Sequence, residues 1–327
     1  MKYRFVAEHR NAHSVEMMAR VLKVARSGFY AWLNRQPSSR TETEKRLVQK
    51  VREIQTQVKH RYGSPRLTKE LGFRGWHVGH NQVARVIAKY GLGAVRKKQF
   101  RVTTKSAKGQ WVAQNILARQ FKVQVPNHSW VSDITYVATA EGWLYLAVVL
   151  DLCSRRVVGW SMGTRLDVQL VLRAFMMAVM RRRPPRGLIF HSDRGSQYAS
   201  QAFRKTLGHW GMQQSMSRKG DCWDNACAES FFNTLKVELI GKTIYASRRD
   251  AQSAIFEYME VFYNRKRLHS TLGYLSPDAY EQRLEKLASW VSTKPGKVQD
   301  PFRRRATVAQ PLGFLATALP FWHSHDR

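Results

Sequence analysis

Three acidic side chains, Asp133, Asp193 and Glu229, occupy sequence contexts in which a carboxylate is unexpected. Asp133 lies inside an apolar segment at 129–140, Asp193 ends another at 188–193, and Glu229 belongs to an amphipathic helical pattern. A carboxylate among buried residues is costly unless it is paired or bound to a metal. Three carboxylates brought together repel one another, so a divalent cation is their natural partner. Ligation by oxygen alone selects hard ions, Mg²⁺ or Mn²⁺, over Zn²⁺.

Such a ligand set suits displacement reactions at phosphorus. When a DNA strand is cut or joined, two metal ions held by carboxylates can activate the attacking oxygen and stabilise the leaving one. Water attacks in cleavage and a DNA 3′-hydroxyl attacks in joining, so no nucleophilic side chain is required. We therefore predict that Asp133, Asp193 and Glu229 are catalytic and bind two Mg²⁺ ions, for which Mn²⁺ can substitute.

Two further residues share the predicted helix of Glu229. Lys236 follows it by seven residues, a spacing that returns to the same helix face about 10 Å away. Asn225 lies on that face one turn earlier. A lysine beside metal-bound carboxylates could hold a DNA phosphate, although a surface lysine fits the spacing equally well. Both residues are candidates for contacting DNA.

The net charge of +32 indicates a polyanionic partner, because neutralising each phosphate releases a counterion. Ribosomal and membrane-surface proteins can be as basic, so charge alone gives only the class of partner. Residues 1–120 carry 26 basic and 6 acidic side chains, against 23 and 15 in residues 121–290. The first third is therefore expected to hold nucleic acid, while the middle keeps carboxylates for another purpose.

Helical patterns dominate the first hundred residues. Residues 14–33 read as two short helices, and 45–58 carry an apolar stripe at helical spacing. Ser64-Pro65 has the form of a cap followed by proline at the first helical position, and the helix after it stops at Gly91. These patterns favour helix-turn-helix units, although ordinary helical pairs would look the same.

That last helix presents polar side chains opposite its apolar face. They are Asn81, Gln82, Arg85 and Lys89. Such residues read base edges or grip phosphate from a major groove, and the basic run 96–98 follows directly. A solvated helix face is the alternative explanation, and the commoner one.

After residue 120 the pattern changes to strands and helices in alternation. Expected strands are 129–140, 143–152, 155–162 and 188–193, and expected helices are 167–180, 200–210 and 226–239. Hairpin strands followed by strands that alternate with helices indicate an α/β fold, a mixed sheet covered by helices.

The three acids stand in segments with a specific resemblance. SDITYV, HSDRGSQY and DNACAESFFNTLK, in this order on strand, strand and helix, closely resemble the catalytic blocks of insertion sequence family three transposases, within the retroviral-integrase superfamily. YNRKRLHSTLGYLSPDAY (263–280) resembles that family's closing block, and YGSPRL (62–67) resembles its helix-turn-helix segment. The resemblance covers residues 12–285 and implies a ribonuclease H-like catalytic core.

The resemblance also implies roles and partners. Asp133, Asp193 and Glu229 match the metal-binding triad, and Lys236 matches a DNA-contacting basic residue. Members of the family work as oligomers on paired element ends, which they cut, join and reinsert into target DNA. Many are fused by frameshifting to the product of an upstream reading frame. This chain starts near the second frame, so DNA, further copies of the chain and the upstream product are its expected partners.

The expected domains follow from these patterns. They are an N-terminal helix-turn-helix-like segment at 1–40, a helix-turn-helix DNA-binding domain at 41–100, a basic linker at 101–120, the integrase core at 121–286, and a disordered tail at 287–327. Residues 288–327 depart from the family's pattern, and a read-through or degenerate tail is the leading interpretation. That departure puts in doubt whether this copy is active.

Two other classes of function remain open at this stage. A nuclease of the same fold would carry the same triad without joining DNA, and a DNA-binding regulator would need only the basic first third. The helix-turn-helix patterns argue against the first, and three acids in catalytic contexts argue against the second.

Several residues have a structural explanation beside a chemical one. Cys222 and Cys227 lack a third soft ligand nearby, and no cysteine accompanies the pair His77 and His80, so a zinc site is not expected. The odd total of three cysteines points to a reducing compartment, and no apolar run reaches the length of a membrane span, so a bacterial cytoplasmic, nucleoid-associated protein is expected.

His191 and Asp151 also have both a chemical and a structural explanation. His191 precedes Ser192-Asp193 and either touches substrate or serves as a hydrogen-bonded structural histidine. Asp151 follows the second strand as either a fourth acid or a turn residue.

Overall fold

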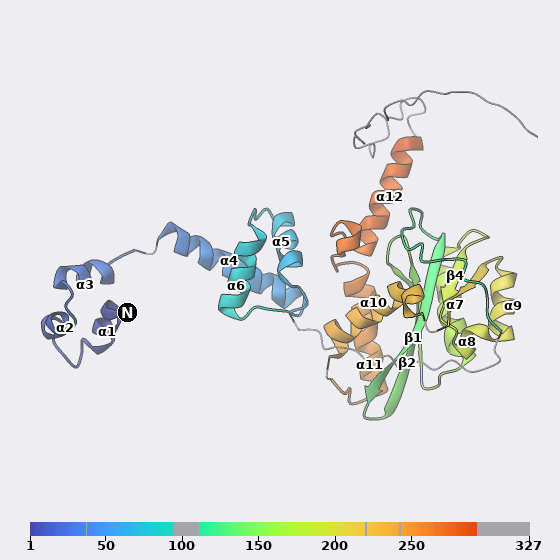
Figure 1. Ribbon diagram of the computed structural model, residues 1–327, viewed down its shortest axis with the longest axis horizontal. Coiled ribbons are helices and arrows are strands. Elements are labelled where there is room, and N and C mark those ends of the chain that lie inside the picture. The colour runs from blue at the N-terminus through green and yellow to red at the C-terminus, as the bar shows by residue number, and fades with distance from the viewer. Residues whose placement is uncertain (37, 95–110, 220, 242, 293–327) are drawn as a thin grey trace, which may run out of the picture. The chain divides into compact units, whose positions relative to one another are not determined.

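The computed structural model describes residues 1–36, 38–94, 111–219, 221–241 and 243–292 (Figure 1). The chain divides into two compact units, Met1–Glu281 and Gln282–Arg327. Helices make up the first part of the larger unit, and a sheet with helices on both faces makes up the rest.

Three short helices open the chain: α1 (Lys2–His9), α2 (Val15–Val21) and α3 (Arg26–Leu33). Val6, Met18 and Phe29 form their small shared core. The sequence patterns predicted α2 and α3 but not α1, whose apolar residues are too few to give a clear helical stripe.

The next three helices are α4 (Ser39–Gln57), α5 (Ser64–Phe73) and α6 (His80–Tyr90). Gly63, rather than Ser64, caps α5, and Gly91 ends α6 with a φ of 65°, as its residue type predicts. The fully buried Gln55 of α4 donates from its amide nitrogen to the carbonyls of Tyr62 and Leu92. One side chain therefore joins the end of α4 to the chain before α5 and after α6.

The remainder of the larger unit is built on a five-stranded sheet. Its strands are β1 (Ser129–Thr139), β2 (Gly142–Asp151), β3 (Val157–Gly163), β4 (Ile189–Ser192) and β5 (Gln213–Met216), in the order β3-β2-β1-β4-β5. β2 is antiparallel to β1 and β3, whereas β4 is parallel to β1 and β5. This is the mixed sheet that the alternation of strands and helices predicted.

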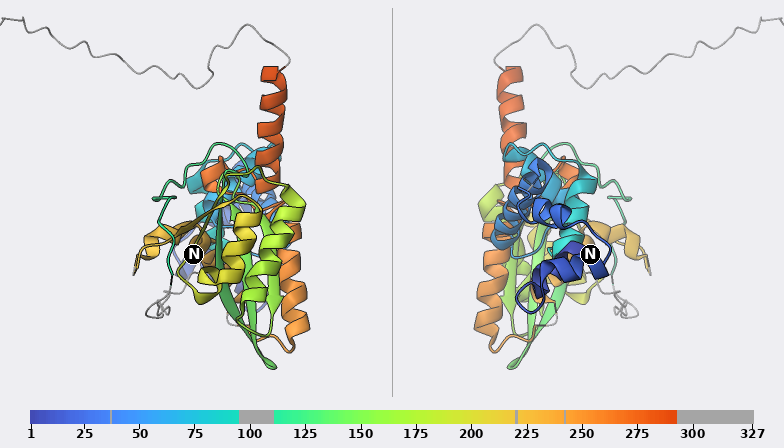
Figure 2. Two further views of the ribbon diagram at one scale, coloured as in Figure 1. Left: turned by 90° about the vertical axis from the view of Figure 1, so that its right-hand side faces the viewer. Right: turned by 90° about the vertical axis from the view of Figure 1, so that its left-hand side faces the viewer.

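Helices cover both faces of this sheet (Figure 1). They are α7 (Val168–Arg182), α8 (Ser196–Ala199) and α9 (Gln201–His209) on one face, and α10 (Ala226–Leu235) and α11 (Arg248–Phe256) on the other. The left view of Figure 2 shows α7 to α9 in front of the strands. Strand residues alternate between the two layers: Trp130 packs with α7 and α9, and Val131 with α10 and α11.

Two helices continue into wider π-helical turns. α10 runs into η2 (Lys236–Ile240), and α11 runs into η3 (Glu257–Tyr263). The predicted regular helix over 226–239 therefore ends at Leu235, and the residues after it turn by less than 100° each.

A buried carboxylate in η2 binds residues of two distant sequence motifs. Glu238, whose side chain is 7% exposed, accepts from Arg267 Nε at 2.8 Å and from the Tyr258 hydroxyl at 2.9 Å. Arg66 of α5 also pairs with Glu238, at 3.4 Å. YGSPRL and the closing block at 263–280 thus contribute to one ion cluster, a structural reason for their residue types.

Strand β5 and the segment before β1 were not foreseen as parts of the core. β5 is only four residues long and polar, so its sequence lacks a strand signal, and pairing with β4 determines it. In the segment predicted as a linker, residues 101–110 lie outside the described residues. Ile116 and Leu117, in the described portion, donate their backbone N–H groups to Ser215 Oγ of β5.

The last helix, α12 (Pro277–Ser292), runs past the predicted domain boundary at 286. Of the predicted tail, residues 293–327 lie outside the described residues. Within the portions that the structure describes, no helix is both long and apolar enough to cross a membrane.

Gly159 of β3 offers a test of how closely the sheet packs on α7. A Cβ at this position would lie 2.3 Å from the Ala174 carbonyl oxygen and 2.7 Å from Ala178 Cβ, so Gly159→Ala should destabilise the fold by about 1–3 kcal/mol. At the exposed helical Gly208, a Cβ would meet no atom within 4 Å, and Gly208→Ala should stabilise by about 0.5–1 kcal/mol. Denaturant unfolding of both variants measures this, and equal effects would contradict the packing.

Candidate active site

Asp133 lies in the middle strand of the sheet. It pairs with Val148 of β2, and strand alternation places it on the same face as Val131, the face covered by α10. Its Oδ1 accepts from the backbone N–H of Ile134 at 2.8 Å. The side chain is half-buried.

Asp193 lies beside it because of strand pairing. β1 and β4 are parallel with Ser132 opposite Ser192, so Asp133 and Asp193 are the next residues along two adjacent strands. Neighbouring strands lie about 4.8 Å apart. Asp193 Oδ1 accepts from the backbone N–H of Gly195 at 3.0 Å, which fixes the turn after β4.

Glu229 comes to the same region on the first turn of α10. Asn225, the residue before α10, donates from Nδ2 to the Ser132 carbonyl at 3.4 Å, which ties the start of the helix to β1 next to Asp133. The Glu229 side chain itself is exposed.

The three carboxyls affect one another electrostatically. Burial raises the pKa of Asp133 well above its usual value, and Asp193 and Glu229 raise it further, while Lys236 opposes them. Burial raises the pKa of Asp193, and burial followed by the charge of Asp193 raises that of Glu229. Asp133 is thus influenced by both other acids, and Glu229 by Asp193, although the three positions are far apart in the chain.

The residues of this site fit a divalent cation. The ion pairs of the described residues include none to Asp133, Asp193 or Glu229, and the Asn225 Oδ1 is buried there without a hydrogen-bond partner among them. Oxygen donors with uncompensated negative charge are what a hard cation binds. Among the described residues, no three acids, histidines or cysteines form a metal-binding cluster as their side chains lie.

Lys236 lies at the start of η2, close enough to Asp133 to influence its pKa. Its Nζ lies 5.6 Å from the centre of the Tyr136 ring. Burial lowers the pKa of Lys236, and the charge of Asp133 partly offsets that effect. The structure therefore brings Lys236 to the acidic site.

Asn225 is placed differently from what its spacing suggested. Its side chain is 3% exposed and donates to the protein backbone. That Asn225 contacts DNA stays a prediction, and the burial of its side chain argues against it.

The polar residues of α6 form a separate group, not part of the acidic site. Asn81 and Arg85 are exposed, and Gln82 is half-buried. Lys89 pairs with Glu44 of α4 at 2.5 Å, so its charge is already compensated within the protein. The other polar side chains of this face have no ion pair among the described residues. They are Asn81, Gln82 and Arg85.

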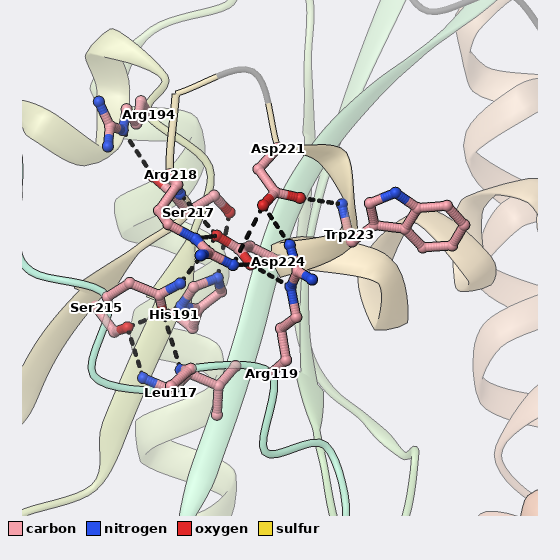
Figure 3. A network of polar contacts seen from close by, with 12 residues as sticks. Leu117, Arg119, His191, Arg194, Ser215, Ser217, Arg218, Asp221, Trp223 and Asp224 are labelled. Atoms are coloured by element: carbon pink, nitrogen blue, oxygen red, sulfur yellow. Dashed lines mark hydrogen bonds and ion pairs between the residues drawn. The ribbon is translucent and has the colours of Figure 1, made fainter.

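His191 has a structural role, which settles the two explanations left open by the sequence. It is fully buried, its Nδ1 lies 2.8 Å from Ser215 Oγ, and its Nε2 lies 3.2 Å from Ser217 Oγ (Figure 3). Burial lowers its pKa to about 4, so the ring is neutral near pH 7. It joins β4 to β5 just before Asp193.

Asp151 and Cys227 also have structural explanations. Asp151 is fully buried and accepts from the backbone N–H groups of Asn127, Cys153 and Ser154, as a turn residue does. Cys227 Sγ lies 2.7 Å from an Arg155 nitrogen, and the side chain of Cys222 lies outside what the structure describes.

Asp224 is a buried residue near the site that its sequence did not single out. Its carboxylate is fully buried and accepts from Arg119 and Arg218 (Figure 3). Hydrogen bonds from Arg218 make the largest contribution to holding the pKa of Asp224 well below its usual range. An aspartate in a loop gives no signal of such burial.

Comparisons with known proteins agree with this architecture. Residues 124–222 and 210–277 match family models described as "Integrase core domain", and residues 42–100 match one described as "HTH-like domain". The chain is 44% identical over 285 residues to the transposase InsF for insertion sequence IS3A of Escherichia coli, covering 86% of this chain and 99% of that protein. It is 42% identical over 272 residues to an uncharacterized 31 kDa protein of insertion element IS600 from Shigella sonnei, covering 83% and 100%.

A solved structure with a distant likeness is the HTLV-2 integrase catalytic core domain in complex with magnesium. The identity is 17% and the TM-score 0.35, over 48% of this chain and 97% of that one.

The buried, neutral His191 predicts how stability depends on pH. Its folded-state pKa of about 4 lies below the ordinary value of 6.5, so the unfolded chain binds more protons between these values. The stabilisation is fully present above pH 6.5 and is lost as the pH falls towards 4, by roughly 3 kcal/mol. Denaturant unfolding between pH 7 and 4.5 should show a shallower loss for His191→Gln than for the unsubstituted protein. Parallel profiles for the two proteins would refute this assignment.

Proposed function

Because this chain belongs to the IS3 family of insertion-sequence transposases, we propose that Asp133, Asp193 and Glu229 form the catalytic centre with which it cuts and joins DNA. The chain is a transposase with an integrase core, a polynucleotidyl transferase. The observation that carries the assignment of residues is the pairing of β1 with β4, which sets Asp133 beside Asp193. The effects of Asp193 and Glu229 on the pKa of Asp133, and of Asp193 on the pKa of Glu229, support it.

The three acids would hold two Mg²⁺ ions, with Mn²⁺ as a substitute. When bound, these ions supply activation of the attacking oxygen and stabilisation of the leaving oxygen in an in-line displacement at phosphorus. Asp133 lies in β1 and Asp193 directly follows the adjacent strand β4, so their backbones hold the two carboxylates as a pair. The exposed Glu229 has the freedom to complete the set when substrate enters.

Lys236 is proposed to hold a DNA phosphate at this site. Its partly buried ammonium lies near the acids, where a phosphodiester must be placed for reaction. Removing water from around a lysine strengthens its attraction to a phosphate. Its position also keeps it close to Asp133, whose charge it partly balances before substrate binds.

The helical first part is proposed to bind the element ends. α6 presents Asn81, Gln82 and Arg85 on its surface, and residues 1–120 carry 20 more basic than acidic side chains. Lys89 contributes to DNA binding when its ammonium leaves Glu44 and pairs with a DNA phosphate. The proposed partners are the element ends and target DNA, further copies of this chain on paired ends, and the upstream reading-frame product, in the bacterial cytoplasm on the nucleoid.

A nuclease that cuts without joining is the second candidate, because the same triad supports it. The product of the reaction distinguishes the two candidates. A transposase makes a joined strand, whereas a nuclease leaves only cut ends. A binding-only regulator would make neither product.

Replacing one central acid tests the enzyme assignment. Asp193→Asn keeps the shape of the side chain but removes a metal-binding charge, so strand joining in Mg²⁺ should fall by at least about a thousandfold. Binding to labelled element ends should change less than about twofold, because the helical region makes those contacts. Glu285→Gln, at an exposed position on α12, is the charge-matched control. Retained joining by Asp193→Asn would exclude this catalytic centre.

Two residues of α6 test the recognition helix. Arg85 is exposed and not ion-paired among the described residues, whereas Lys89 must first give up Glu44. Arg85→Ala should therefore weaken binding to element ends about tenfold or more, and Lys89→Ala less. Fluorescence anisotropy with an element-end duplex and a scrambled duplex measures both variants. An unchanged affinity of Arg85→Ala would assign recognition to another surface.

A further inference from the structure

A second group of charged residues lies beside the proposed catalytic centre, in the turn that precedes α10. Its centre is Asp224, which is fully buried in η1 (Cys222–Asn225). Asp224 accepts from Arg119 Nε at 2.8 Å and from the side chain and backbone N–H of Arg218 at 2.9–3.0 Å (Figure 3). It also accepts from Asn115 Nδ2 at 2.9 Å. We refer to Asn115, Arg119, Arg218 and Asp224 as the Asp224 clamp.

The clamp joins three stretches of chain. Asn115 and Arg119 come from the segment that lies along β5, Arg218 comes from the loop after β5, and Asp224 comes from the turn before α10. The stretches that carry Asn115, Arg119 and Arg218 lack regular structure, and Asp224 lies in the single short turn η1. The clamp therefore contributes to the position of that turn.

On one side the clamp is fixed to the strand that leads to Asp193. The Ser217 backbone N–H donates to the Ser192 carbonyl at 3.0 Å, and Arg194 Nε donates to the Ser217 carbonyl at 2.6 Å. Arg218, the next residue, is therefore held at the end of β4.

On the other side it is fixed to the strand that carries Asp133. Asn225, which follows Asp224 directly, donates to the Ser132 carbonyl. Glu229 lies on the first turn of the helix that starts here. A helix is stiff over one turn, so fixing the residue before α10 fixes where the backbone of Glu229 lies, while its exposed side chain can still turn.

The charges of the clamp argue against a role in holding DNA phosphate. Arg119 and Arg218 each pair with both Asp224 and Asp221, so two arginines meet two carboxylates. A phosphate would have to displace a buried carboxylate that accepts five hydrogen bonds, and such a charge is strongly destabilising when left unpaired.

We propose that Asp224, held by Arg119 and Arg218, is a positioning residue that sets Glu229 against Asp133 and Asp193 for metal binding. This inference rests on the proposed function of those three acids. It also assigns the segment around 115–119 to the working parts of the catalytic core.

Manganese binding by the full-length protein, measured by calorimetry, tests the proposal. Asp224→Asn keeps the size of the side chain and removes its charge, and it should weaken Mn²⁺ binding about tenfold, as loss of a residue that orients a ligand does. Glu229→Gln should weaken it at least as much. The double variant should bind no more than about twofold less tightly than Glu229→Gln, because Asp224 acts through Glu229.

Glu281→Gln is the matched control. Glu281 is a buried carboxylate held by Arg156 and Arg182, so its loss disturbs a similar ion cluster elsewhere in the core. We expect a lower melting temperature and unchanged Mn²⁺ affinity. Equal weakening by Glu281→Gln would show that general loss of stability explains the effect, and would overturn the proposal.

The remaining outcomes distinguish a failure of the proposed catalytic centre from a failure of the proposed clamp. Unchanged Mn²⁺ binding in Glu229→Gln would refute the proposed catalytic centre itself. Weakened binding in Glu229→Gln with unchanged binding in Asp224→Asn, or additive effects in the double variant, would refute only the clamp. If Asp224→Asn does not fold, Arg119→Lys keeps the charge and removes the forked hydrogen bonds. It should weaken Mn²⁺ binding about threefold, and unchanged affinity would refute the clamp.

Discussion

The cost of burying carboxyl groups close to one another shapes the centre of this sheet. Pairing of β1 with β4 puts Asp133 and Asp193 side by side, and Glu229 of α10 adds a third negative charge. Burial raises the pKa values of all three acids, and neighbouring acids raise those of Asp133 and Glu229 further, so ionising the three together is unfavourable. In the proposed function, a divalent cation would relieve this repulsion. The apolar layers on both faces of the sheet must hold this arrangement in place.

Other buried acids of the same chain differ from Asp133, Asp193 and Glu229 because arginines pair with them. Asp224, Glu238 and Glu281 are each held by two arginines, and each joins segments that are distant in sequence. The acids of the catalytic centre have no such ion pair among the described residues. Arginine-paired carboxylates thus join distant segments, while Asp133, Asp193 and Glu229 would be available for metal in the proposed function. Lys236 lies near these three acids, and its charge opposes the rise in the pKa of Asp133.

The local patterns of the chain were informative where elements are long and apolar. Strands β1 to β4, helices α6 and α7, and the stop at Gly91 follow from residue types and periodicity. β5 and the packing of residues 115–119 could not be predicted, because four polar residues and an irregular segment carry no local signal. The regular helix through Lys236 ended earlier than expected, since a π-helical turn is selected by packing rather than by propensity.

The sequence by itself determined which acids stand in apolar strands and in an amphipathic helix, and through its motifs it determined the family. Only the tertiary structure decided that Ser132 faces Ser192, which makes Asp133 and Asp193 neighbours, and that Asn225 is buried against β1. It also decided that His191 is neutral and structural and that Asp224 is clamped by arginines. The reason is physical: strand register and the burial of a charge arise from contacts between residues far apart in the chain, and no local pattern encodes them.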